Sequence, residues 1–265
     1  MDQPTGTPLT LSEKIIKNHL VKGEMSPGKE ITLKIDQCLL QDATGTMAWL
    51  EFEAIGVPKV KNNLVVQYID HNLMQQDNKN MDDHFFLMSI GSKFGAKVSL
   101  PGNGVCHHVH KERFTQPGQI VIGTDSHTPT SGGSGMIAIG VGGMDIAVAM
   151  ATEQYTLIMP KIVGVNLTGK LQEWCNAKDV ILELLRQVNV DGGKGKIFEF
   201  FGEGVKSLDV SERSSITNMG AETGATTSIF PSDELTKQFF EKEKRVEDYQ
   251  PLQADAGATY AEIIT

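Results

Sequence analysis

Short apolar runs alternate along the chain with longer segments in which apolar residues recur at helical spacing. Residues 64–69 (LVVQYI) form a nearly continuous apolar run, which is typical of a strand buried on both faces of a parallel sheet. Asn78–Phe94 has helical spacing, and Asp82 and Asp83 suit the positive N-terminal end of such a helix. Further strands are expected at residues 31–35, 97–100, 119–123, 161–167, 196–201 and 226–230, and further helices at 44–55, 144–152, 178–188 and 211–222.

Capping residues mark the start of the first and the last predicted helix. Thr10 and Glu13 have the spacing of a capping box, and the helix that follows is expected to include Leu20. Ser232 is expected to cap the last helix, with Asp233 in its first turn. Each cap supplies a helix boundary that hydrophobic spacing alone leaves open.

Strands that alternate with helices predict an α/β fold with largely parallel pairing. The turn at Met159 and Pro160 is the expected domain boundary, which gives one α/β domain over residues 1–160 and a second over 161–265. The final residues ATYAEIIT resemble the opening of another strand, so we expect the second domain to be truncated at its C-terminal end.

Composition and charge narrow the class of protein. The 265 residues carry a formal net charge of -9, which disfavours a nucleic-acid partner. The three cysteines Cys38, Cys106 and Cys175 form no C-x-x-C pair, so a reducing compartment and a cytoplasmic location are expected. No apolar stretch approaches the roughly 20 residues that span a bilayer, and the first residues do not have the pattern of a signal peptide.

Two Asp and His segments directly follow predicted strands. Asp70 and His71 come after the strand at 64–69, and Asp125 and His127 come after the strand at 119–123. In open α/β sheets ligands bind beyond the carboxyl ends of strands, so the two segments could share one cleft. A carboxylate beside an imidazole fixes its tautomer and raises its pKa, which suits proton transfer near neutral pH. The alternative is a pair of ordinary surface histidines.

The segment CHHVH at residues 106–110 invites comparison with a metal site. Its histidines lack the standard H-x₃₋₅-H spacing, so we favour a polar surface turn for His108 and His110 and predict no metal ligands. Ten glycines between Gly102 and Gly143 permit close approach of backbone to backbone, or of backbone to a small anion beside Ser126.

Asn218 and Glu222 stand four residues apart, which would place both on one face of the helix expected at 211–222. Such a pair usually lies on a solvated surface. Gly220 weakens this helix, so a specific docking place is the alternative that we favour.

Four motifs resemble the aconitase family: QDAT at 41–44, DH at 70–71, GTDSHTP at 123–129 and NMGAETGATTSIFP at 218–231. They run over essentially the whole chain in the order of the family. The resemblance implies aconitase-like three-layer α/β/α domains with mainly parallel sheets. The 3-isopropylmalate dehydratase large subunits and the homoaconitases are relatives, and the QDAT and SHTP segments are closer to aconitase.

By motif position, the resemblance implies three carboxylate–histidine pairs, two substrate-binding residues and one residue beside the cofactor. The pairs would be Asp70 with His71, Asp125 with His107 and Glu222 with His127, Gln41 and Ser126 would bind substrate, and Asn218 would hydrogen-bond near the cofactor. In this resemblance His71 would protonate the departing hydroxyl group of the substrate.

The family's cofactor is a [4Fe–4S] cluster, held by cysteines of an S-C-T-N segment and a later C-x-x-C, neither of which this chain contains. The resemblance therefore implies the N-terminal part of a hydro-lyase that interconverts citrate and isocitrate through cis-aconitate and is inactive alone. A tricarboxylate and the missing C-terminal portion are the expected partners. The alternatives are a fragment of a 3-isopropylmalate or homoaconitate dehydratase, and a non-catalytic module that binds a tricarboxylate or a partner protein.

Overall fold

The computed structural model describes residues 7–265. The N-terminal segment that was considered as a signal peptide lies partly outside these residues. The helices are α1 (Leu11–His19), α2 (Gly45–Ile55), α3 (Asn78–Phe94), α4 (Cys106–Arg113), α5 (Gly143–Thr152), α6 (Ala177–Val188), α7 (Val210–Gly220) and α8 (Glu234–Lys242). Short 3₁₀ segments are η1 (Thr128–Ser134), η2 (Glu203–Ser207), η3 (Ala221–Thr223) and η4 (Val246–Asp248).

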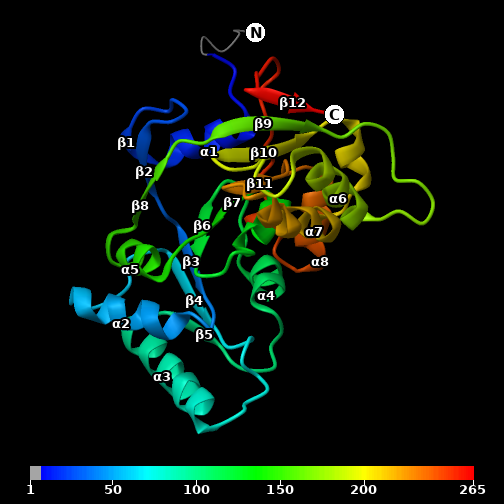
Figure 1. Cartoon of the computed structure of the whole chain (residues 1–265). Coiled ribbons are helices and arrows are strands. Elements are labelled where there is room, and N and C mark those ends of the chain that lie inside the picture. Colours follow the sequence, from blue (N-terminus) through cyan, green and yellow to red (C-terminus); the bar gives the residue numbers. More distant parts are fainter. Residues whose placement is uncertain (1–6) are drawn as a thin grey trace.

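The strands belong to three sheets (Figure 1). The first sheet contains β3 (Gln37–Leu40), β4 (Leu64–Tyr68), β5 (Lys97–Ser99), β6 (Ile120–Gly123) and β7 (Ile137–Gly140). The second sheet contains β9 (Lys161–Asn166), β10 (Lys196–Phe201), β11 (Thr227–Ile229) and β12 (Glu262–Ile264). The third sheet contains β1 (Leu20–Gly23), β2 (Glu30–Lys34) and β8 (Gln154–Ile158).

The two larger sheets are parallel throughout. Their strand orders are β5-β4-β3-β6-β7 and β11-β10-β9-β12, and the third sheet, β1-β2-β8, is antiparallel. This arrangement confirms the expected α/β class with mainly parallel sheets.

The first sheet is covered by helices on both faces. Alternate strand residues point to opposite faces, so Val65 packs with Trp49 of α2, whereas Val66 and Tyr68 pack with Cys106 of α4. Figure 1 shows α2, α3 and α5 gathered on one side of these strands. The layers are therefore helix, sheet and helix, and the parallel strands are buried as their apolar runs predict.

The second sheet is packed against α6 and α7 on one face and against α1 on the other. Phe198 and Phe200 belong to the core with α6 and α7, whereas Ile197 belongs to the core that contains α1. Glu199 of β10, which is buried, accepts hydrogen bonds from the backbone N–H groups of Leu11 (2.9 Å) and Ser12 (2.8 Å). The N-terminal helix thus docks on the C-terminal sheet, and the division into residues 1–160 and 161–265 remains a proposal.

The capping box at the first helix is confirmed. The Glu13 N–H donates to Thr10 Oγ1 over 3.1 Å, and the Thr10 N–H donates to Glu13 Oε2 over 2.8 Å. The expectation that the helix includes Leu20 is wrong, because α1 ends at His19 and Leu20 opens β1.

The predicted cap of the last helix is also wrong. The N-cap is Asp233, whose Oδ1 accepts from the N–H groups of Leu235 (3.1 Å) and Thr236 (3.2 Å). Ser232 lies one residue before this N-cap and is instead paired through its backbone with Leu252, over 2.8 Å and 3.0 Å. None of the helices within residues 7–265 is long and apolar enough to cross a membrane.

Candidate active site

Three neighbouring strands end at the same edge of the first sheet. Because β4, β3 and β6 are adjacent and parallel, their carboxyl ends bring together the residues that follow each strand. From β3 the chain proceeds through β4 and β5 on one side, and then through β6 and β7 on the other. The point where the strand order changes direction, between β3 and β6, is where open α/β sheets form their ligand crevice.

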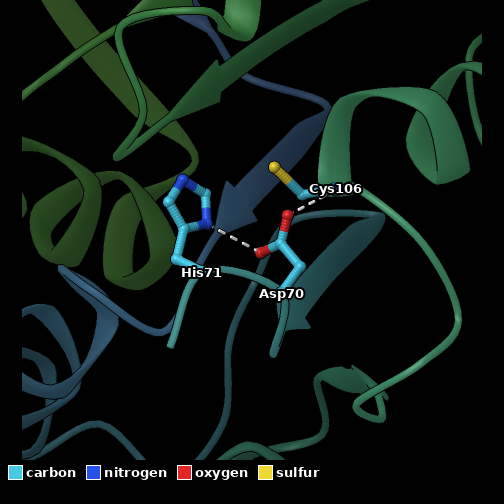
Figure 2. A group of neighbouring side chains, drawn as sticks. All are labelled: Asp70, His71 and Cys106. Carbon is cyan, nitrogen blue, oxygen red and sulfur yellow. Dashed lines mark hydrogen bonds and ion pairs between the residues drawn. The ribbon is translucent and has the colours of Figure 1, made fainter. Parts of the chain in front are cut away.

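His71 lies between two carboxylates at this edge. Its Nδ1 atom is 2.9 Å from Asp70 Oδ1, and its Nε2 atom is 3.1 Å from Asp125 Oδ2. Figure 2 shows the Asp70 carboxylate between His71 and Cys106, whose backbone N–H donates to the second Asp70 oxygen over 2.6 Å. Burial would lower the pKa of His71, but its hydrogen bond to Asp70 and the charges of Asp70, Asp125 and Asp42 raise it above its ordinary value.

Asp125 connects the segments that follow two strands. Its Oδ1 atom is 3.0 Å from His107 Nε2 and accepts the backbone N–H of His127 over 2.8 Å. Burial would raise the pKa of Asp125, but the hydrogen bonds from His107 and His127 and the charges of His107 and His71 hold it well below its usual range. Asp125 is therefore an ionised acceptor at neutral pH.

The third pair crosses from one part of the chain to the other. His127 Nε2 is 3.2 Å from Glu222 Oε1, and His127 Nδ1 is 3.2 Å from Ser126 Oγ. Glu222 lies in η3 after α7, because the expected single helix at 211–222 ends at Gly220. The three expected pairs of Asp70 with His71, Asp125 with His107 and Glu222 with His127 are thus in contact, and His127, Ser126 and Glu222 are accessible to solvent.

Asn218 and Gln41 bind neighbouring protein groups instead of an imidazole. The Asn218 amide donates to Thr130 Oγ1 over 2.8 Å, which ties α7 to η1. The side-chain oxygen of Gln41 accepts the backbone N–H of Ala43 within its own loop. The hydrogen bonds of Gln41 and Asn218 therefore do not join the carboxylate–histidine pairs.

The glycines of η1 permit close packing against the second part of the chain. A Cβ atom added to Gly133 would lie 2.5 Å from both the backbone nitrogen and the Oγ atom of Ser214 in α7. An added Cβ at Gly132 would collide with the carbonyl oxygen of Ser228. These contacts account for two of the glycines by the packing explanation.

Sequence reasoning missed Asp42 and His84. Asp42 lies two residues after the end of β3, and its Oδ1 accepts the N–H groups of Asp70 (3.0 Å) and His71 (2.8 Å). His84 of α3 is buried with its Nε2 3.1 Å from Asp42 Oδ2. The position of Asp42 after a strand is the same signal that identified Asp70 and Asp125, but the strand before it was not predicted.

The expectation of a polar surface turn is wrong for His110, and for His108 only the surface position is confirmed. Both residues lie in α4, and His110 is fully buried between the Tyr68 hydroxyl and Gln37 Oε1, each 2.9 Å from a ring nitrogen. Burial, with the nearby His107 and Arg245, lowers the pKa of His110 to about 3. His110 is a neutral histidine of the core, and His108 is exposed on the outer side of α4.

Several side chains that can bind a metal lie close together at the site. Cys106 lies with Asp70 and His71, and also with His107 and Asp125, in groups whose potential ligand atoms are within 4.8 Å of one another. A [4Fe–4S] cluster needs several thiolates, but Cys38 is buried in the core on β3 and Cys175 is exposed in a loop. Burial and the charge of Asp70 raise the pKa of the Cys106 thiol. The cysteines of this chain do not fit such a cluster by themselves.

Comparison with known proteins identifies the family. The model of the aconitase family (aconitate hydratase) matches residues 13–265. The chain belongs to the aconitase family. It is 40% identical to a probable mitochondrial aconitate hydratase of Caenorhabditis elegans, with 97% of this chain and 36% of that protein covered. It is 38% identical to the mitochondrial homocitrate dehydratase of Saccharomyces cerevisiae, with the same two shares covered.

A relative in Dictyostelium discoideum, a probable mitochondrial aconitate hydratase, is 44% identical over 84% of this chain and 31% of its own length. The chain therefore spans about a third of the length of the curated relatives it matches. The expected cytoplasmic location is wrong, because these relatives are named as mitochondrial proteins and point to the mitochondrion. The three cysteines allowed a reducing compartment to be inferred, but they do not distinguish one such compartment from another.

Proposed function

We propose that this chain supplies the proton-transfer and part of the substrate-binding residues of an aconitase-family hydro-lyase that interconverts citrate and isocitrate through cis-aconitate. The observation that carries the proposal is the position of His71, between Asp70 and Asp125 at an accessible sheet edge. Membership of the aconitase family supports the reaction class.

In the proposed reaction His71 acts as the general acid. Two carboxylates favour the imidazolium form, in which Nδ1–H donates to Asp70 Oδ1 and Nε2 lies 3.1 Å from Asp125 Oδ2. The Nε2 proton passes to the substrate hydroxyl group as its C–O bond breaks, so that oxygen leaves as water. The electron pair of the adjacent C–H bond forms the double bond, and its proton passes to a base outside the described residues.

The other two pairs and the polar side chains have supporting roles in the proposal. His107 holds Asp125 in place, and His127 with Glu222 extends the polar edge toward η3. Ser126 is exposed beside His127 and is proposed to bind a substrate carboxylate, as is Gln41. Asn218 is proposed to act near the cofactor, whose cysteine ligands this chain does not supply.

A dehydratase for a related tricarboxylate is the second candidate. The relative named homocitrate dehydratase is 38% identical over 97% of this chain, almost as similar as the relatives named aconitate hydratase. The residues proposed for proton transfer would serve either substrate, since both lose a hydroxyl group as water. If the chain is instead a non-catalytic module, it is expected to bind a tricarboxylate or a partner protein, and the chimera is expected to show no turnover of substrate.

The experiment joins this chain to the remaining part of the Saccharomyces cerevisiae aconitate hydratase, a relative of which it covers 36%. The chimera is expected to hydrate cis-aconitate, whereas this chain alone is expected to be inactive and to develop no cluster absorbance with iron and sulfide. In the chimera His71→Asn is expected to lower kcat by about 10²–10⁴-fold. A folded chimera with the activity unaffected by His71→Asn would contradict the proposed role.

A further inference from the structure

Asp42 is a buried carboxylate with four hydrogen-bond donors. Beyond the N–H groups of Asp70 and His71, its Oδ2 accepts the N–H of Asn72 over 2.8 Å and faces His84 Nε2 at 3.1 Å. Its side chain is 0% exposed. Three consecutive backbone N–H groups of the segment that carries His71 therefore point at one carboxylate.

The N–H groups of residues 70–72 stabilise the charge of Asp42, and Asp42 in turn holds the backbone of these residues in place. Within residues 7–265 no lysine or arginine forms an ion pair with Asp42, so its charge is stabilised chiefly by the three N–H groups and by His84. Burial would raise the pKa of Asp42, but the N–H groups of His71, Asn72 and Asp70 hold it below its usual value. Losing the carboxylate would leave the amides of this loop without an acceptor.

His84 fixes the other end of the same loop. Gln75 Nε2 is 3.3 Å from His84 Nδ1, and because that amide nitrogen can only donate, the His84 proton lies on Nε2 and points to Asp42. The segment from Asp70 to Gln75 is thus held at its start by Asp42 and at its end by His84. This buried pair connects β3 and α3 to the loop of the proposed acid.

We propose that Asp42 is a positioning residue that fixes the Asp70 and His71 backbone so that the His71 imidazole stays between Asp70 and Asp125. The consequence for the reaction rests on the proposed function above. The positioning itself concerns only this chain and can be tested without substrate. His84 supports Asp42 by donating the fourth hydrogen bond.

The test measures the pKa of His71 by NMR titration of the histidine rings in the complete 265-residue chain. Asp42→Asn is expected to lower the pKa of His71 by about one pH unit, because a charge 3.8 Å from Nδ1 is lost and the Asp70 contact loosens. The matched control is Glu199→Gln, a buried carboxylate that also accepts two backbone N–H groups but contacts α1 and not this site. The control is expected to leave the pKa of His71 unchanged.

An unchanged pKa of His71 in a folded Asp42→Asn variant, or an equal shift in Glu199→Gln, would overturn the proposal. If Asp42→Asn does not fold, amide hydrogen exchange of the unsubstituted chain decides. The amides of Asp70, His71 and Asn72 are expected to be protected at least 100-fold relative to an unstructured peptide, and exchange at the unstructured rate would overturn the proposal. Neither measurement needs a substrate. If the chimera is inactive but the pKa of His71 shifts as expected, the proposed reaction is contradicted and the positioning role of Asp42 is supported.

Discussion

At the scale of single residues, Asp125 organises the site. It faces His107 and His71 through its two oxygens and also accepts the His127 backbone N–H. We expect Asp125→Asn to lower the free energy of unfolding by about 2 kcal/mol at pH 7, because hydrogen bonds to a buried charged group are lost. Urea unfolding of the variant and the unsubstituted chain measures this difference.

The pH dependence of that difference has a defined sign. The pKa of Asp125 is lower in the folded chain than its ordinary value of about 3.9, so its contribution is present above that pH and is lost as the pH falls through the folded pKa. The difference in the free energy of unfolding between the unsubstituted chain and the Asp125→Asn variant is therefore expected to narrow below about pH 4. A gap that stays constant from pH 7 to pH 3 would contradict this account of Asp125.

The sequence predicted this part of the site well because its signals are local. His71 and His127 follow two short apolar runs rich in Val and Ile, so their place at strand ends could be inferred without a structure. Asp42 could not be found in the same way, because β3 (QCLL) contains none of the Val and Ile residues that mark β4 and β6, and it is preceded by the buried polar Asp36. The burial of His110 depends on Tyr68 and Gln37, which are distant in sequence.

At the scale of elements, the packing of η1 against α7 joins the two parts of the chain. Gly133→Ala is expected to lower the free energy of unfolding by about 2 kcal/mol, because the new Cβ would collide with the backbone of Ser214. Gly143→Ala on α5 is the control, since the nearest atom there, 3.3 Å away, is the carboxylate oxygen of Glu51 at the end of a flexible side chain. Equal stability of the two variants in urea would contradict the close packing of η1.

Some elements were predicted with accurate bounds, and others were missed. The helix at Asn78–Phe94 and the strand at Lys196–Phe201 agree with α3 and β10 at both ends. The helix α4 was missed because CHHVHKER has three histidines and no regular apolar spacing, and β7 was missed within the glycine-rich segment. The caps show the same limit, since Ser232 and Asp233 are both good caps and tertiary pairing with Leu252 decides between them.

At the scale of the whole molecule, the site is rich in carboxylates. Among residues 7–265 no lysine or arginine forms an ion pair with Asp42, Asp70, Asp125 or Glu222, and the whole chain has a net charge of -9. A tricarboxylate is therefore expected to bind this chain weakly, with a Kd of about 1 mM or higher. Binding is expected to tighten as the pH falls, because the raised pKa of His71 means that its ring becomes a cation on acidification.

The central claim is that these converging histidines form the proton-transfer part of a tricarboxylate site. The most direct measurement is NMR of the histidine rings of the complete chain during addition of cis-aconitate. The ring signals of His71 and His127 are expected to shift in a saturable manner, while His19, which pairs with Asp36 at the opposite end of β3, is expected to remain unchanged. Saturable shifts confined to His19, or no saturable shift of any histidine, would contradict the claim.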